Sequence, residues 1–311
     1  MTGVGVTHPS AASAAVGARR LTVSPMDAEC AASARGMKLT NFFDLALKVP
    51  PTARKCTWQV GTAAGLTIAD RAAIAWIIAD AAMRQRGGGS NVHTTWRTAA
   101  LGGTKLAGNE QKRVAAFVDA VFGLPPHGKS EDHLVGHVAE WMWFLHAAET
   151  VDPTRIPVVL EAPKFNVTEP GADGFIVFHE TATNEHHYRL WELKKHTAAG
   201  PVSATVTSAY NQLDLKAMRY LAQQVSIHST IAGPIGELCS QLVDFWLESH
   251  DRAGVGVGVT TASAPPATCF TTMGRRFPGF DRPGQLEGLL LSVEDLAEIA
   301  KDVRRYLWIV L

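Results

Sequence analysis

Residues 171–196, GADGFIVFHETATNEHHYRLWELKKH, carry the most informative pattern in the sequence. Two runs rich in Val, Ile, Phe, Tyr and Leu flank the polar segment 180–187, and this pattern predicts a β-hairpin. Because side chains alternate between the two faces of a strand, Glu192 and Lys194 are expected on the same face. Asp173 opens the first strand, so the hairpin is expected to return the chain beside it.

Two carboxylates and a lysine therefore converge in a region that is expected to be buried. Burying one charge alone is costly, so such a group requires a partner or a metal ion. Carboxylate oxygens suit Mg²⁺, for which Mn²⁺ can substitute, and a bound metal ion makes a water molecule more acidic. A lysine beside them can stabilise developing negative charge, and it can act as a base only if its pKa is depressed. The cluster predicts hydrolysis of a phosphodiester.

The flanking sequence predicts helices and strands in an order typical of an α/β fold. The expected elements are a helix over 129–149, a strand over 156–162, the hairpin, helices over 203–225 and 236–249, a strand over 254–263 and a helix over 292–310. Ser292 is expected to cap the last helix. This order predicts a mixed sheet flanked by helices.

The rest of the chain is expected to form two further regions. The predicted divisions are a flexible lead over 1–37, a helical accessory region over 38–124, and a catalytic domain with a C-terminal helix over 125–311. In the accessory region, Thr67 and Asp70 form a capping box before a helix that ends at three glycines, 87–89. A second helix is expected over 109–123.

Three motifs in this order resemble a known superfamily. They are Glu140 in HVAEW on a helix, Asp173 in GADGF on a strand, and Glu192-x-Lys194 in WELKK on the next strand. This pattern resembles the PD-(D/E)xK nucleases, which have a restriction-endonuclease-like α/β fold. The resemblance covers residues 130–262, which are under half of the chain.

The resemblance implies a role for each matching residue. It implies that Asp173 and Glu192 bind Mg²⁺, that the Leu193 carbonyl completes the coordination sphere, and that Lys194 serves the attacking water. Glu140 is implied to bind a second metal ion or to position a ligand.

Gln212, on the following helix, resembles the glutamine that RecB-like members carry near the metal site. The sequence departs from the family pattern at Ala172, where the pattern has proline; this variation is common and leaves the assignment standing. The resemblance also implies a DNA endonuclease, either a restriction enzyme or a partner-dependent effector in bacterial defence against foreign DNA.

Several other features have a functional and a structural interpretation. Basic side chains near the cluster form either a phosphate-binding rim or a solvated face; they are Lys194, Lys195, His196, Lys216 and Arg219. His133, His137 and Glu140 share a helix face that can chelate zinc, but without an HExxH motif the histidines are expected to pack or to line the approach to the site. His186 and His187 are expected as a solvated pair in the hairpin turn. Glycines 254, 256 and 258 alternate with valine, which indicates a strand under a close neighbour.

Bulk composition narrows the function classes. The 311-residue chain has 29 Lys and Arg against 29 Asp and Glu, so its formal charge is zero. This balance argues against non-specific coating of nucleic acid, which requires a basic surplus. Four scattered cysteines indicate a reducing cytoplasm, and no apolar stretch is long enough to cross a membrane.

The expected partners follow from these features. DNA is the expected substrate, and RNA is left open. Without an ATP-binding motif in the chain, any ATP use would require a helicase or ATPase partner. A homodimer is a further possibility, because this fold often cuts duplexes as two copies. The alternative function is an inactive nuclease-fold module that binds nucleic acid or a partner protein.

Overall fold

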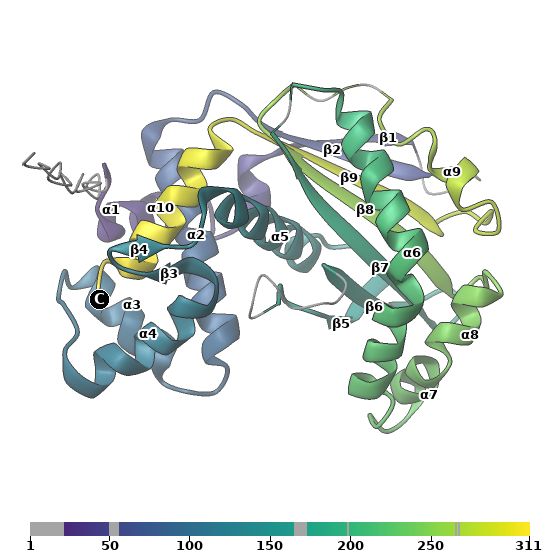
Figure 1. Ribbon diagram of the computed structural model, residues 1–311, viewed down its shortest axis with the longest axis horizontal. Helices are drawn as coiled ribbons and strands as arrows, with labels where there is room; N and C mark the ends of the chain where they lie inside the picture. The colour runs from purple at the N-terminus through teal and green to yellow at the C-terminus, as the bar shows by residue number, and fades with distance from the viewer. Residues whose placement is uncertain (1–21, 50–55, 165–172, 198, 265, 267) are drawn as a thin grey trace, which may run out of the picture.

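The computed structural model describes residues 22–49, 56–164, 173–197, 199–264, 266 and 268–311. Its main sheet has seven strands in the order β1-β2-β9-β8-β7-β6-β5 (Figure 1). The strands are β1 (Asp44–Val49), β2 (Thr57–Ala63), β5 (Arg155–Leu160), β6 (Gly174–Glu180), β7 (Glu185–His196), β8 (Ala253–Thr261) and β9 (Leu286–Val293). The four central strands, β2, β9, β8 and β7, are parallel, whereas β1, β6 and β5 pair antiparallel at the two edges.

Helices cover both faces of this sheet. One face carries α1 (Pro25–Ala34), the 3₁₀-helix η1 (Leu39–Phe42), α2 (Ile68–Gly87), α3 (Val92–Leu101), α4 (Gly108–Phe122), α5 (Glu131–Glu149) and α10 (Leu296–Trp308). The other face carries α6 (Val202–His228), α7 (Pro234–Ser240), α8 (Leu242–Leu247) and the short α9 (Met273–Arg276). A two-stranded pair, β3 (Gly123–Leu124) and β4 (His127–Gly128), follows α4. The predicted mixed sheet flanked by helices is confirmed.

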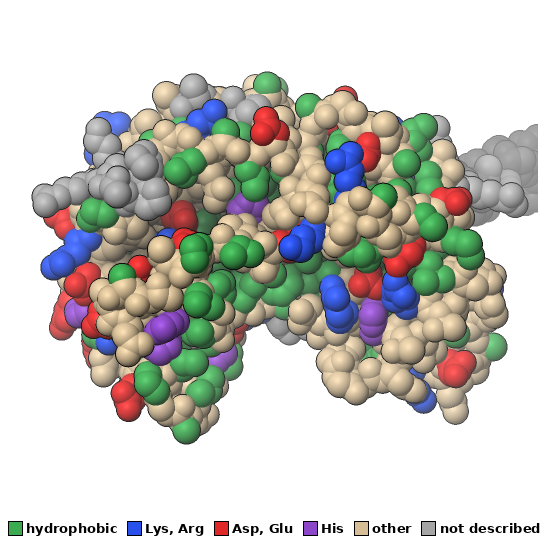
Figure 2. All heavy atoms as spheres, turned by 180° about the vertical axis from the view of Figure 1, so that it is seen from behind, with side chains coloured by type: hydrophobic (Ala, Val, Ile, Leu, Met, Phe, Trp, Pro, Cys, Tyr) green, Lys and Arg blue, Asp and Glu red, His purple; other side chains and the backbone are tan. Residues whose placement is uncertain are grey.

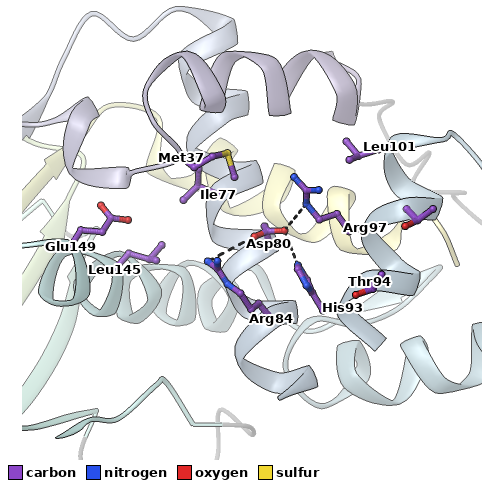
Figure 3. Close-up of a pocket in the computed structure, with 11 residues that line it drawn as sticks. Met37, Ile77, Asp80, Arg84, His93, Thr94, Arg97, Leu101, Leu145 and Glu149 are labelled. Atoms are coloured by element: carbon purple, nitrogen blue, oxygen red, sulfur yellow. Dashed lines mark hydrogen bonds and ion pairs between the residues drawn. The ribbon is translucent and has the colours of Figure 1, made fainter. Parts of the chain in front are cut away.

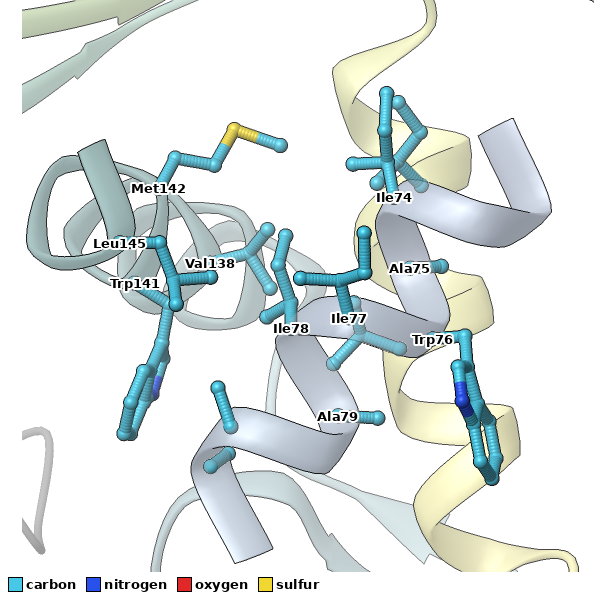
Figure 4. Close-up of a cluster of buried hydrophobic side chains, with 14 of the residues drawn as sticks. Ile74, Ala75, Trp76, Ile77, Ile78, Ala79, Val138, Trp141, Met142 and Leu145 are labelled. Atoms are coloured by element: carbon cyan, nitrogen blue, oxygen red, sulfur yellow. The ribbon is translucent and has the colours of Figure 1, made fainter. Parts of the chain in front are cut away.

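The helical layer is built around α2, which packs against α1, α10 and α5. The predicted capping box is present. The Thr67 side chain accepts a hydrogen bond from the Asp70 backbone N–H, and the Asp70 carboxylate accepts one from the Thr67 backbone N–H. From this start α2 runs to its glycines and buries most of its residues, including Ile78. Figure 4 shows Ile78 directed toward Val138 of α5, with Ile77 beside it. Among the described helices, none has the length and apolar character needed to span a bilayer.

The predicted hairpin forms from β6 and β7. β6 and β7 pair antiparallel, with Gly174 opposite Trp191. The strands extend further into the predicted turn than expected, so that His186 pairs with His179 within the ladder. The prediction of a solvated histidine pair in the turn is therefore wrong, since both His186 and His187 are half-buried strand residues.

The glycines of β8 lie under large side chains, as their alternation predicts. A Cβ on Gly256 would lie 2.2 Å from the Trp191 ring, and one on Gly258 would lie 2.6 Å from a Leu193 methyl carbon. Glycine is thus required where β8 passes beside β7.

Four local predictions are wrong. The expected helical region over 38–124 also contributes β1 and β2, which extend the same sheet as the hairpin. The expected flexible lead contains α1, capped by Ser24 and buried at Ala28 and Ala32; residues 1–21 lie outside the described part. Ser292 belongs to β9, and the last helix begins after Asp295. The helix expected over 236–249 is interrupted at Gln241, between α7 and α8.

Candidate active site

Asp173 lies beside the Glu192–Lys194 pair. Gly174 pairs with Trp191, so Asp173, one residue earlier, is carried to the level of Glu192. The Leu193 backbone N–H donates to Asp173 Oδ2 at 2.9 Å, which fixes the carboxylate against β7. The convergence predicted from the alternation of side chains is therefore present in the structure.

Glu192 and Lys194 form a close ion pair on the α6 side of β7. Lys194 Nζ donates to Glu192 Oε1 and, at 3.1 Å, to Gln212 Oε1 on α6. The Glu192 side chain is fully buried, and its other oxygen, Oε2, has no hydrogen-bond partner among the described residues. A buried carboxylate oxygen without a partner is costly, and such atoms are common at functional sites.

The environment changes the acidity of all three groups. Burial raises the pKa of Asp173 well above its usual range, and the negative charges of Glu192 and Glu140 raise it further. Burial also raises the pKa of Glu192, although Lys194 opposes this shift. Burial alone would lower the pKa of Lys194, but Glu192 and Asp173 outweigh it and raise the pKa. Lys194 is therefore protonated here, which favours charge stabilisation over a role as general base.

The raised pKa of Asp173 predicts a stability cost at neutral pH. A carboxyl whose pKa is higher in the folded state binds protons more tightly there, so the free energy of unfolding falls as pH rises through the interval between the unfolded and folded pKa values. We expect metal-free Asp173→Asn to be more stable than wild type at about pH 8, with the difference shrinking toward about pH 4, near the pKa of a free Asp. Urea unfolding in EDTA measures this; equal stability at both pH values would contradict it.

Glu140 approaches the same centre from α5. It lies close enough for its charge to raise the pKa of Asp173, and it is hydrogen-bonded to His137 Nδ1 at 3.1 Å. His137 is buried, and its Nε2 lies 2.8 Å from Trp141 Nε1 and 3.1 Å from an Arg86 guanidinium nitrogen. The histidine on this face thus packs and supports Glu140.

These contacts determine the tautomer of His137. Indole and guanidinium nitrogens only donate, so Nε2 must accept and the ring proton must lie on Nδ1, directed at Glu140. Burial lowers the pKa of His137, which keeps the ring neutral. We expect ¹⁵N NMR of the labelled protein to show a neutral His137 with a protonated Nδ1. A protonated Nε2 would contradict the hydrogen-bond assignment.

One residue near the site was not predicted from the sequence. Tyr220, two turns after Gln212 on α6, has its hydroxyl 3.5 Å from Gln212 Nε2. Burial raises its pKa, and the charges of Glu192 and Asp173 add to this effect. Tyr220 follows Gln212 by eight residues on one helix. This spacing places both side chains on the same face of α6, and it could have indicated Tyr220 from the sequence.

The predicted basic rim is divided by the structure. Lys216 and Arg219 are exposed on α6. The positive charge of Lys216 acts to lower the pKa of Glu192. Lys195 lies on the opposite face of β7 and pairs with Asp132. His196 is buried and hydrogen-bonded to Thr205 at 2.7 Å, so this arrangement does not offer it to a phosphate. Only the two α6 residues remain suitable for a rim beside the carboxylates.

The carboxylates present fit a hard cation better than zinc. Two acidic side chains with an unpartnered oxygen match Mg²⁺, which commonly binds one or two carboxylates and keeps several waters. Within the described ranges, no group of three or more His, Cys, Asp and Glu side chains is arranged to hold a metal ion. Asp173 and Glu192 are the residues that would bind it, with Glu140 near the same centre.

A cavity lies away from the carboxylates, between α2, α3 and α5. It has a volume of about 420 Å³, and Figure 3 shows His93, Arg97 and Arg84 directed at Asp80 inside it. His93 Nε2 lies 2.8 Å from Asp80 and Arg97 Nε 3.1 Å, while Arg97 also pairs with Glu29. The arginines are thus balanced by acids, and the cluster ties α3 to α2.

Comparison with known proteins adds no family assignment. No protein-family model matches the chain, and no curated protein matches it in sequence.

Proposed function

We propose that this protein is a metal-dependent endonuclease that hydrolyses phosphodiester bonds in DNA. The observation that carries the proposal is the hydrogen bond from the Leu193 N–H to Asp173, which holds one carboxylate beside the Glu192–Lys194 pair. The element order α5, β5, β6, β7, α6, β8 also supports a restriction-endonuclease-like core, because the resemblance predicts the glutamate helix, the hairpin and the glutamine helix in that order.

The residues divide the chemistry among them. Asp173 and Glu192 would hold Mg²⁺, which when bound supplies charge neutralisation and a more acidic water. Lys194, protonated, stabilises the negative charge that develops on the phosphate oxygens. Gln212 holds Lys194 in place, and Tyr220 contacts Gln212. Glu140 adds a third carboxylate near the centre, oriented by His137.

The test is cleavage of supercoiled plasmid by the purified full chain. We expect nicked and linear products with Mg²⁺ or Mn²⁺, and none after addition of EDTA. A parallel panel of single-stranded DNA, duplex RNA and single-stranded RNA identifies the preferred substrate. Absence of cutting on every substrate, together with no Mn²⁺ binding by calorimetry, would overturn the proposal in favour of a non-catalytic binding module.

A role in bacterial defence, as a partner-dependent effector or a restriction enzyme, rests on the resemblance and on the balanced charge of the chain. A helicase or ATPase partner and a homodimer belong to the same proposal. A methyltransferase gene beside this one would favour restriction, and a helicase or ATPase gene would favour a defence complex.

A further inference from the structure

The last turn of α2 places an arginine, Arg86, against the helix that carries Glu140, although α2 lies outside the part of the sequence that resembles the nucleases. One guanidinium nitrogen of Arg86 lies 3.1 Å from His137 Nε2 on α5 and 3.5 Å from the Lys164 carbonyl oxygen, which follows β5. The other terminal nitrogen donates to the Phe117 carbonyl oxygen of α4 at 3.3 Å. A single side chain thus joins α2 to three other parts of the chain.

Arg86 holds its charge away from the open surface. Figure 2 shows Lys and Arg side chains scattered over the surface together with Asp and Glu side chains. Arg86 is instead partly buried, and burial lowers its pKa to about 10, so the guanidinium is still protonated at neutral pH. The negative charge of Glu140 opposes this shift. Because a charge taken out of water is costly unless an opposite charge compensates it, Arg86 and Glu140 stabilise each other.

His137 lies between these two charges. Its Nε2 accepts from Arg86, and its Nδ1–H donates to Glu140 Oε2 at 3.1 Å. The imidazole is 1% exposed, and Trp141 donates to the same Nε2 at 2.8 Å. With partners at both nitrogens the ring has a fixed orientation, and so does the carboxylate that accepts from it. Outer partners of this kind orient the groups that bind a metal ion.

Phe122 of α4 covers the arginine and the histidine together. Its ring centroid lies 5.7 Å from that of His137, edge to face, and 5.4 Å from the Arg86 guanidinium carbon. Phe122 itself is 1% exposed. Charges interact more strongly where water is kept away, so this cover strengthens the attraction between Arg86 and Glu140.

We propose that Arg86 is a positioning residue for the candidate active site and acts through His137 on Glu140. Arg86 holds the histidine, the histidine holds Glu140, and the charge of Glu140 acts on Asp173. The inference rests on the proposed function, because Glu140 is taken to serve the metal ion. It gives α2, and with it the helical layer, a part in orienting the third carboxylate of the site.

The test is a double-mutant cycle in the full chain, with Arg86→Met and Glu140→Gln made singly and together. Methionine keeps an unbranched chain without the charge, and glutamine keeps an acceptor for His137 without the charge. Calorimetry measures Mn²⁺ affinity, and urea unfolding in EDTA measures stability. Arg97→Met is the matched control, because Arg97 also joins helices of the same layer through ion pairs. Arg86→Gln repeats the cycle if Arg86→Met does not fold.

We expect Arg86→Met to weaken Mn²⁺ binding about tenfold, the lower end of the range for loss of a group that orients a metal ligand. Arg86→Lys, which keeps the charge, should lose less, and Arg97→Met should bind Mn²⁺ like wild type. In the Glu140→Gln background, Arg86→Met should cause no further loss, because the carboxylate on which Arg86 acts is already gone. A purely structural role would lower the urea midpoint and leave Mn²⁺ affinity unchanged.

The cycle in EDTA keeps this inference separate from the proposed function. We expect the two substitutions together to lower the urea midpoint by less than the sum of their single effects, as for residues that interact. If wild type binds no Mn²⁺, the proposed function fails, and the cycle in EDTA alone decides whether Arg86 acts on Glu140. Additive midpoints would overturn the inference. With a wild type that binds Mn²⁺, so would an unchanged affinity in Arg86→Met, or an equal loss with and without the Glu140 carboxylate.

Discussion

Replacing Asp173 by Asn or Lys194 by Ala is expected to lower metal-dependent DNA cleavage by on the order of 10²–10³-fold, the loss typical of removing one group that stabilises transition-state charge. Asn keeps an acceptor for the Leu193 N–H but removes a negatively charged metal ligand. Alanine at 194 removes the cation and leaves Glu192 buried without its partner. The rate of plasmid nicking under saturating Mn²⁺ measures both effects.

Matched controls separate this prediction from general damage to the protein. Asp302→Asn and Lys301→Ala repeat the same substitutions on α10, and both variants should cut at the wild-type rate. Asp302 pairs with Arg305, and Lys301 pairs with Glu298 at 2.9 Å and with Glu131 at the start of α5 at 3.5 Å. Because metal-free Asp173→Asn is expected to be more stable than wild type near pH 8, its loss of activity cannot be assigned to unfolding. Equal cutting by wild type and both site variants would show that the catalytic assignment is wrong.

The part of the site that could be predicted from the sequence is the part built by local pairing. In an antiparallel hairpin, register and alternation are properties of adjacent residues, so the approach of Asp173 to Glu192 followed from segment 171–196 alone. Gln212 was predicted through the resemblance, and the helix that carries it is regular. The contact between His137 and Arg86 could not be predicted, because the two residues are 51 positions apart in the chain and no local pattern pairs them.

Two of the strands that were not predicted, β2 and β9, pair with each other over a long distance in the chain. β9 pairs in parallel with β2, more than 220 residues earlier in the chain, and no local pattern specifies such a partner. Ser292 has the side chain of a helix cap, but the ladder extends through it to Thr62 and Thr261. β1 and β2 were not predicted, because the clearest pattern in residues 38–124 was that of the helix at 68–86. Tertiary pairing thus overrode local preference at these positions.

Replacing Ile78 by Ala is expected to destabilise the protein by about 2–5 kcal/mol, the range for a buried aliphatic side chain. Ile78 is fully buried on α2, in the core that joins α2 and α5 to one face of the sheet. The cost combines lost burial with the cavity left between packed helices. Urea unfolding followed by far-UV circular dichroism and by tryptophan fluorescence measures it.

The control lies on the same helix. Ile68, in the first turn of α2, is 54% exposed, and Ile68→Ala should change the free energy of unfolding by less than about 0.5 kcal/mol. Since α2 shares its core with α5, β7 and β9, Ile78→Ala should shift a single transition seen by both probes. Two separate transitions, with only one shifted, would instead mean that the helical layer folds independently of the sheet. In that case the position of Glu140 on α5, relative to Asp173 and Glu192 on the sheet, would depend on the stability of the contact between the helical layer and the sheet.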